Sequence, residues 1–273
     1  MKPPRFRYIA ADSLAAALAA KAEHGADARF LAGGQSLIPA MNFRLAQPGV
    51  LIDINPLAEL DYVREDGTLR IGALTRMRTL ERSGLVAERA PLLFEAVPHV
   101  AHPQIRNRGT LGGNLAHADP ASELPAVALA LRARLHLKSK NSHRSIDAKS
   151  FFTGALTTAL RDDEMLVEVE LPSMPLRTGT CFLEVARRRG DYAMMGVAAV
   201  VTPGRGARIA FCNAGATPVL VALSQLDDAT TQVQKEIDPP GNVHATKAFQ
   251  RHLAGVLTRR ALEIAVSRVG GGR

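Results

Sequence analysis

The alternation of apolar and polar residues predicts a small α/β unit in the first part of the chain. Short strand-like runs alternate there with runs in which apolar residues recur every three or four positions, as on one face of a helix. This order of elements is typical of parallel strands joined by helices. The expected strands cover Phe6–Ile9, Arg29–Leu31 and Val50–Ile54. One expected helix is capped by Asp12 or Ser13 and stops at Gly25, and a second covers Leu37–Leu45.

The pattern changes after Leu60, where antiparallel strands become the expectation. The runs Leu60–Arg64 and Thr68–Ile71 flank Asp66-Gly67, and an Asp-Gly pair favours a tight hairpin turn. Helical patterns and further strand-like runs then complete an α+β subdomain. One expected helix begins near Arg76 with Thr75 as its capping residue, and two more cover Pro91–Val97 and Ala126–Leu131. The expected strands cover Leu135–Lys138, Arg144–Ile146 and Met165–Leu171.

Prolines at Pro172 and Pro175 indicate a boundary before the last part of the chain. Beyond it, three strand-like runs precede an amphipathic helix that begins near Thr246. We interpret the polar, proline-containing segment Asp227–Asn242 as a loop. The chain is thus expected to divide into residues 1–55, 56–175 and 176–273, with strands of the last division at Thr180–Ala186, Gly196–Val201 and Arg208–Cys212.

Composition argues against several classes of protein. The chain has 34 Lys and Arg against 26 Asp and Glu, a formal charge of +8, but the basic residues are dispersed rather than clustered with aromatic ones as in nucleic-acid-binding proteins. Cys181 and Cys212 lack the spacing of a metal site or a disulfide framework. No run is long enough to span a membrane, and the N-terminus has no apolar signal core. We therefore expect a cytoplasmic protein.

A glycine pair between an expected strand and an expected helix is the first candidate for function. Ala32–Ser36, here called the first loop, contains Gly33-Gly34, whose backbone N–H groups suit a phosphate, and Ser36 adds a hydroxyl. The segment matches neither GxGxxG nor GxxxxGK[ST], so neither a Rossmann fingerprint nor a P-loop is indicated. A plain structural turn is the alternative reading of this loop.

A second glycine cluster lies within Ile105–Pro125. Its segment Arg108–Asn114, here called the second loop, contains three glycines that could adopt positive φ and expose N–H groups as an anion-binding nest. Both loops could converge on one ligand that contains a pyrophosphate. Asp119 would suit a hydroxyl of that ligand, since a carboxylate only accepts hydrogen bonds. Alternatively, Asp119 could cap a helix that starts at Pro120.

No catalytic set accompanies these loops. The serines Ser36, Ser122 and Ser150 do not lie in a GxSxG elbow. Histidines 99, 102 and 117 match no HExxH or related zinc pattern. A phosphate-binding site without a nucleophile or metal ligands indicates chemistry that is carried by a cofactor.

These segments resemble the FAD-binding medium subunit of molybdenum hydroxylases, the family of aerobic carbon monoxide dehydrogenase and xanthine dehydrogenase. The resemblance rests first on AGGQSL and IRNRGTLGGNLAHADPASELP, the two glycine loops with their flanks. It extends over nearly the whole chain. The other matching segments are 39–54, 151–172, 184–200, 211–219 and 252–262.

The resemblance implies an α+β, PCMH-type FAD-binding fold, in which two α/β subdomains precede a C-terminal three-stranded antiparallel sheet with helices. It implies that FAD lies between the first two subdomains, and it implies no catalytic residue or metal ligand in this chain. Glu184 stands where many relatives carry a lysine, so no contact is assigned to it. The implied FAD-binding residues are Ala32, Gly33, Gly34, Gln35, Ser36, Leu37, Thr110, Leu111, Gly112, Gly113, Asn114, Asp119, Leu166 and Tyr192.

The resemblance also implies partners. A large subunit would carry molybdopterin and a small subunit two [2Fe–2S] clusters, in a dimer of heterotrimers. Electrons would pass from the clusters to FAD and then to an external acceptor. The two cysteines of this chain are too few for such clusters, which need several thiolates each. A self-contained flavin oxidoreductase and a non-catalytic FAD-binding assembly subunit are the alternatives, and the sequence indicates neither the substrate nor the acceptor.

Overall fold

The N-terminal sheet is parallel, as the order of its elements predicts. In the computed structural model, which describes residues 2–270, β3 lies between β1 and β2 and is parallel to both. The Ser13 hydroxyl caps the first helix by accepting from Ala16 N, and Gly25, at φ 52°, ends it. The elements are β1 (Arg7–Ala10), α1 (Leu14–His24), β2 (Ala28–Leu31), α2 (Leu37–Asn42) and β3 (Val50–Asp53).

The second sheet has five antiparallel strands in the order β4-β5-β10-β6-β7. The predicted hairpin is confirmed, with Gly67 at φ 66° in its turn. The strands are β4 (Val63–Asp66), β5 (Thr68–Gly72), β6 (Arg134–Lys138), β7 (His143–Asp147) and β10 (Met165–Leu171), and a separate two-stranded pair is β8 (Phe152–Gly154) with β9 (Thr157–Thr158). The helices are α3 (Met77–Arg82), α4 (Gly84–Arg89), α5 (Pro91–Ala96), α6 (Pro103–Arg106), α7 (Leu111–His117), α8 (Glu123–Ala130) and α9 (Ala148–Phe151).

The expected cap of α3 is wrong. The helix begins at Met77 without a side-chain cap. The Thr75 hydroxyl instead donates to the Tyr62 carbonyl at 2.8 Å and accepts from the Tyr62 N–H at 3.1 Å. The residue before β4 therefore uses the hydroxyl that the local sequence assigns to the helix.

The C-terminal sheet has four antiparallel strands, one more than expected. The additional strand, β14, pairs antiparallel with β13 and buries Val221 and Leu223. Asp227–Asn242 is also not a loop throughout, because α10 forms within it and buries Ala229 and Val233, which lie on one helical face. The elements are β11 (Gly179–Ala186), β12 (Ala193–Thr202), β13 (Gly206–Cys212), β14 (Val219–Leu223), α10 (Ala229–Glu236) and α11 (Lys247–Ser267).

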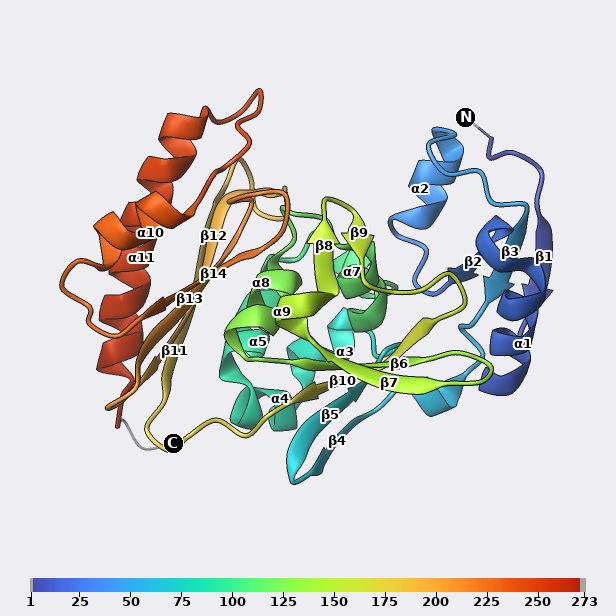
Figure 1. Ribbon diagram of the computed structural model, residues 1–273, viewed down its shortest axis with the longest axis horizontal. Coiled ribbons are helices and arrows are strands. Elements are labelled where there is room, and N and C mark those ends of the chain that lie inside the picture. Colours follow the sequence, from blue (N-terminus) through green and yellow to red (C-terminus); the bar gives the residue numbers. More distant parts are fainter. Residues whose placement is uncertain (1, 271–273) are drawn as a thin grey trace.

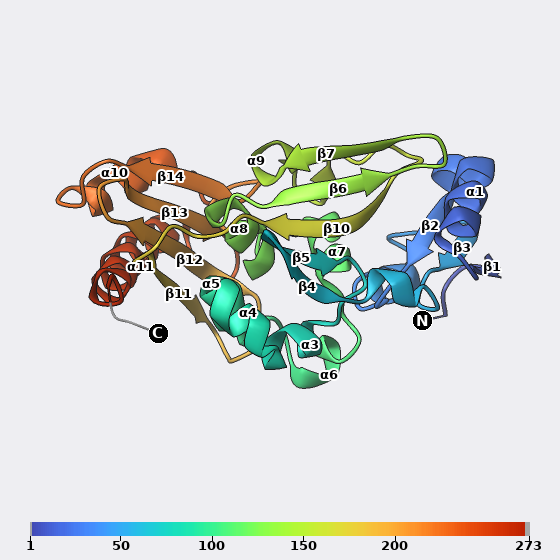
Figure 2. The same ribbon diagram turned by 90° about the horizontal axis from the view of Figure 1, so that it is seen from below.

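Helices cover both faces of the C-terminal sheet. Figure 1 and Figure 2 show α11 on its outer side and α8 on the side toward the second sheet. Alternate residues of β12 divide between the two faces: Ala198 and Val200 join the core of the second sheet, and Val197 and Ala199 join the core under α11. The strand is almost entirely buried, because both of its faces are covered.

The three larger sheets come from consecutive stretches of chain that follow one another along the molecule (Figure 1). The division into residues 1–55, 56–175 and 176–273 stays a prediction. No helix within residues 2–270 is long and apolar enough to cross a membrane.

Asn213 connects the C-terminal sheet to the segment that leads into α8. Its N–H donates to the Pro120 carbonyl at 2.6 Å, and its side-chain amide donates to the Ala193 carbonyl at 2.8 Å. Its φ of 58° lies in the left-handed region, which asparagine tolerates better than most residues. This one residue therefore links the second and third parts of the molecule.

Asn213→Ala is expected to lower the free energy of unfolding by about 2–4 kcal/mol, because it removes the amide hydrogen bonds and places alanine at a left-handed φ. Asn213→Gly loses the same hydrogen bonds but adopts that φ freely. Urea denaturation should therefore rank the glycine variant between wild type and the alanine variant. Equal losses in the two variants would show that the backbone conformation does not contribute.

Candidate functional site

The first loop combines a packed glycine with a left-handed one. Gly33 is buried, and a Cβ on it would overlap with the Arg108 carbonyl of the second loop. Gly34 has φ 73°, which permits the turn into α2, and a Cβ there would meet Ile38 at 3.2 Å. Glycine is therefore favoured at both positions by the backbone, at Gly33 by close packing and at Gly34 by its positive φ.

The first loop has free hydrogen-bond donors. None of the backbone N–H groups from Gly33 to Leu37 donates a hydrogen bond to another group of the described chain. The side-chain amide of Gln35 bonds back to the Gly33 carbonyl at 2.8 Å, and Ser36 is exposed and makes no side-chain cap on α2. A run of unpaired N–H groups is a suitable binding site for an anionic group.

The second loop is built differently from the expectation. Its glycines have no positive φ, and Gly112 and Gly113 lie in the first turn of α7. The predicted nest of exposed N–H groups is therefore wrong, because most of these groups are already paired. Leu111 donates to Thr75 O at 3.0 Å, Gly112 to Ala73 O at 2.9 Å, Gly113 to Thr110 Oγ1 at 3.1 Å and Asn114 to Thr110 O at 3.0 Å.

Close packing explains the glycine at position 112. A Cβ on Gly112 would lie 2.5 Å from the Ala73 Cβ and 2.8 Å from the Ala73 carbonyl oxygen. Gly113 faces the other way and is exposed, with only Thr110 Oγ1 and the Ala32 Cβ within 4.0 Å of a built Cβ. The two glycines thus lie on opposite sides of α7. Gly112 faces Ala73, directly after β5, and Gly113 faces the first loop.

The structure brings the two loops together. The first loop meets the second where Gly33 packs against the backbone of Arg108 and Gly109. Glycine at position 33 is required because the two backbones touch there. The convergence of these loops, which lie far apart in sequence, is the geometric basis of a shared binding surface.

Sequence reasoning missed two residues that bridge the loops. Arg76 donates from Nη2 to Asn55 Oδ1 at 2.7 Å and from Nη1 to the Arg108 carbonyl. The Asn55 side-chain amide donates to the Ala32 carbonyl at 2.7 Å. Neither residue lies in a glycine loop or a motif, so only their positions could have indicated them: Asn55 lies two residues after β3, and Arg76 lies directly before α3.

The segment after α7 is held by side chains. Asn114 Oδ1 accepts from the Ser122 hydroxyl at 2.9 Å, and no residue of the described chain pairs with the Asn114 amide nitrogen. Asp119 is not a helix cap, because α8 begins at Glu123 after Ser122. Its carboxylate accepts a hydrogen bond from Ala121 N at 2.9 Å, and this bond closes a turn around Pro120. The alternative interpretation of Asp119 as a cap is therefore wrong.

Tyr192 comes from the C-terminal part and lies beside Asp119. The residue as a whole is 65% exposed, so only the part of the phenol that faces Asp119 is shielded from water. This partial shielding and the negative charge of Asp119 raise the pKa of Tyr192 above its ordinary value, and the charge of Glu123 acts in the same direction. The phenol therefore stays neutral and can donate a hydrogen bond throughout the physiological pH range.

Buried carboxyl groups lie behind Tyr192. Glu123 is 4% exposed, and its burial, with the charges of Glu184 and Asp119, raises its pKa to about 8. Glu184 lies 3.0 Å from His99 through one carboxylate oxygen, and its other oxygen is buried without a hydrogen-bond partner in the described chain. Two acidic groups thus share the interface between α8 and the C-terminal sheet.

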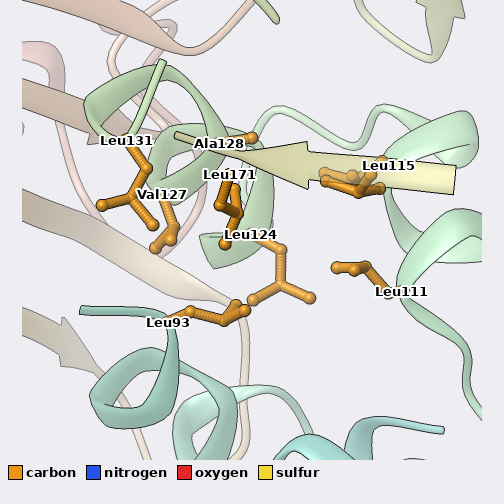
Figure 3. Close-up of a pocket in the computed structure, with 9 residues that line it drawn as sticks. Leu93, Leu111, Leu115, Leu124, Val127, Ala128, Leu131 and Leu171 are labelled. Carbon is orange, nitrogen blue, oxygen red and sulfur yellow. The ribbon is translucent and has the colours of Figure 1, made fainter. Parts of the chain in front are cut away.

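The remaining predicted residues, Leu111 and Leu166, are buried in the apolar core of the second sheet. Figure 3 shows Leu111 beside a cavity of about 10 Å³ under α7 and α8, which is too small and too apolar for a cofactor. A larger groove of about 510 Å³ follows residues 172–178, and no predicted cofactor residue lines it. The candidate site is therefore defined by the loops rather than by either cavity.

One cluster on the second sheet has the residue types of a metal site. It consists of His136, Glu168 and Glu170. Arg70 donates to Glu168 at 2.6 Å and lies 3.5 Å from Glu170, and His136 lies 2.8 Å from Glu170. Because an arginine already pairs with both carboxylates, we interpret the cluster as an ion-pair network that stabilises the sheet.

Comparison with known proteins gives a family match over most of the chain. The family described as the FAD binding domain in molybdopterin dehydrogenase matches residues 4–174. Two relatives are similar over almost the full length. The 6-hydroxypseudooxynicotine dehydrogenase complex subunit alpha of Paenarthrobacter nicotinovorans is 39% identical, covering 98% of this chain and 97% of the relative. Caffeine dehydrogenase subunit beta of Pseudomonas sp. (strain CBB1) is 40% identical, with the same coverage of 98% and 97%.

A solved structure has the same fold. Carbon monoxide dehydrogenase from Hydrogenophaga pseudoflava, in a form lacking the Mo-pyranopterin moiety of its molybdenum cofactor, contains a chain that superposes with a TM-score of 0.94. The two chains are 36% identical, and the match covers 99% of this chain and 100% of the other. The predicted mixed helix and sheet fold is thereby confirmed, with the extra strand β14.

The buried Glu123 carboxyl predicts an unusual pH dependence of stability. Its pKa is about 8 in the folded protein against 4.5 as the ordinary value. Because the folded state retains this proton and the unfolded state releases it, stability should fall as pH rises from about 5 to 8, by up to about 1.4 kcal/mol per pH unit. Urea denaturation of Glu123→Gln across this range should give a flatter profile.

Glu88→Gln is the matched control, since the Glu88 side chain is 53% exposed. This variant should keep the wild-type slope. If Glu123→Gln also kept that slope, the Glu123 carboxyl would already be ionised in the folded protein at neutral pH.

Proposed function

This chain belongs to the family of FAD-binding domains of molybdopterin dehydrogenases, and from that membership we propose that it is the FAD-binding electron-transfer subunit of a molybdenum hydroxylase. It would receive electrons from the [2Fe–2S] clusters of a partner and deliver them to an external acceptor. The observation that carries the proposal is the pairing of a donor-rich first loop with a second loop in direct backbone contact. FAD supplies the ability to accept and pass on electrons.

The residues present fit FAD. The diphosphate of the cofactor needs hydrogen-bond donors, and the unpaired N–H groups of Gly33–Leu37 supply them. Gly113 is exposed toward Ala32, so its missing side chain leaves room for a ligand between the loops. The Asn114 amide, unpaired in the described chain, adds a donor on the opposite side.

Each predicted residue has a role in this proposal. Gly33–Leu37 would donate backbone N–H groups from the loop that begins at Ala32, and Thr110–Asn114 would form the facing wall. The Asp119 carboxylate would accept from a hydroxyl or ring N–H of the cofactor. Leu166 supports the site from inside the core, because it packs in the same apolar cluster as Leu111. Tyr192 would cover the cofactor on the side of the C-terminal sheet.

The partners follow from the same family membership. We propose a large molybdopterin-binding subunit and a small [2Fe–2S] subunit, assembled as a dimer of heterotrimers in the cytoplasm. Both cysteines of this chain are buried and far fewer than two clusters require. The clusters and the molybdenum centre would therefore belong to other chains.

Substrate choice is assigned to those other chains. The relatives described above are named for 6-hydroxypseudooxynicotine and caffeine, at 39% and 40% identity. The solved structure, at 36% identity, belongs to a carbon monoxide dehydrogenase. Proteins so similar to this chain serve three chemically different substrates, so the shared FAD subunit does not select among them.

Gly33→Ala is expected to weaken FAD binding, because the added methyl group separates the first loop from the Arg108 carbonyl. Overpacking of this kind costs about 1–3 kcal/mol, which corresponds to about a 5- to 150-fold rise in Kd. Titration of the apoprotein with FAD, followed by flavin fluorescence, measures the change. Gly84→Ala is the control, since a Cβ at Gly84 meets open space. Similar Kd values for both variants would exclude the loop contact from the cofactor site.

Tyr192→Ala is expected to change the rate at which the bound flavin is reduced by the assembled complex, with little change in FAD content. The reason is that the exposed phenol lies at the edge of the site rather than among the loop donors. Stopped-flow bleaching of the flavin absorption band measures reduction, and flavin released in acid measures content. Rapid reduction of the isolated chain by an organic substrate, without partner subunits, would favour a self-contained flavin enzyme instead.

A further inference from the structure

A continuous path of hydrogen bonds joins the two loops through side chains outside both of them. It runs from the Ala32 carbonyl to the Asn55 amide at 2.7 Å, from Asn55 Oδ1 to Arg76 Nη2 at 2.7 Å, and from Arg76 Nη1 to the Arg108 carbonyl. Asn55 follows the central strand of the N-terminal sheet, and Arg76 precedes α3 of the second part. The path therefore crosses the boundary between two sheets at the candidate cofactor site.

The backbone around Arg76 is fixed on the second-loop side. Residues 76 and 110 form an isolated antiparallel bridge. The Met77 N–H donates to the Gly109 carbonyl at 3.0 Å, and the Leu111 N–H donates to the Thr75 carbonyl at 3.0 Å. Arg76 is thus rigidly attached to the second loop, and its guanidinium reaches across to the first part of the chain.

The Arg76 charge has no carboxylate in direct contact among the described residues. Its two hydrogen-bond partners are the Asn55 side-chain amide oxygen and the Arg108 backbone carbonyl. Burial lowers its pKa, Asp61 and Asp53 act at longer range in the opposite direction, and Arg108 adds a further positive charge nearby. The guanidinium therefore leaves a positive potential where the loops meet, which favours an anionic group.

We propose that Arg76 and Asn55 are positioning residues for the cofactor diphosphate: they hold the donor-rich first loop against the second loop, and Arg76 adds positive charge to the joint. The inference rests on the proposed FAD site and adds two residues outside its glycine loops. Only arginine suits this place, because its planar fork can donate to two acceptors in different segments at once. Asn55 is suited in turn, because it accepts from Arg76 and donates to Ala32 with one side chain.

The test compares FAD titrations of the full-length apoprotein carrying Arg76→Met, Arg76→Lys or Asn55→Ala. Each titration is repeated at several salt concentrations, and urea denaturation of each apoprotein is measured in parallel. Arg268→Met is the matched control, because Arg268 also joins two parts of the molecule, through Glu95 and the Thr180 carbonyl, away from the loops.

Arg76→Met should raise the Kd for FAD by about 10- to 100-fold, the cost of losing charge-assisted hydrogen bonds, and should flatten its salt dependence. Arg76→Lys should keep the salt dependence but bind about 10-fold more weakly than wild type, since one ammonium group cannot span both acceptors. Asn55→Ala should weaken binding without changing the salt dependence. Arg268→Met should lower the urea midpoint and leave the Kd within about twofold of wild type.

An Arg76→Met protein that binds FAD as wild type does would overturn the inference. A similar rise in Kd for Arg268→Met would also overturn it, because the weaker FAD binding of the two variants would then reflect a general loss of stability. Should Arg76→Met fail to fold, Asn55→Ala still decides, since it removes the link to the first loop and leaves Arg76 in place. A wild-type apoprotein that binds no FAD would instead refute the proposed function itself.

Discussion

The contact between Gly33 and the Arg108 carbonyl fixes how the first two parts of the molecule meet. A side chain at position 33 would occupy the volume of that carbonyl, so the two backbones can touch only where glycine stands. Arg76 and Asn55 complete the contact with hydrogen bonds from both sides. Because of this contact, two segments that are distant in sequence act as one surface, and the candidate site exists only while they remain together.

The two loops divide the work of that surface. The first loop keeps the N–H groups of Gly33–Leu37 free of internal partners. Those of the second loop are mostly paired, for example with the carbonyls of Ala73 and Thr75. One loop can therefore donate to an anion without first breaking hydrogen bonds, while the other is a rigid wall. Such prior organisation lowers the entropic cost of binding, because less of the protein must become ordered.

The C-terminal sheet is joined to the second sheet by a common core rather than by a surface contact. Residues of β12 such as Ala198 and Val200 pack in the same apolar cluster as α8. Asn213 ties the sheet to the turn before that helix, and this places Tyr192 beside Asp119. The buried Glu123 and Glu184 side chains lie at this same contact, so protonation of Glu123 is coupled to how the third part of the molecule packs.

The sequence determined the order of most of the longer strands and helices and the place of the two loops, because apolar spacing and glycine pairs are local signals. Tertiary structure decided what those glycines do. Gly112 has no positive φ; it is glycine because Ala73 packs where its side chain would be. It also formed β14 and α10, whose short patterns gain stability only by packing on neighbours. Arg76 and the raised pKa of Glu123 depend on partners distant in sequence, which no local pattern records.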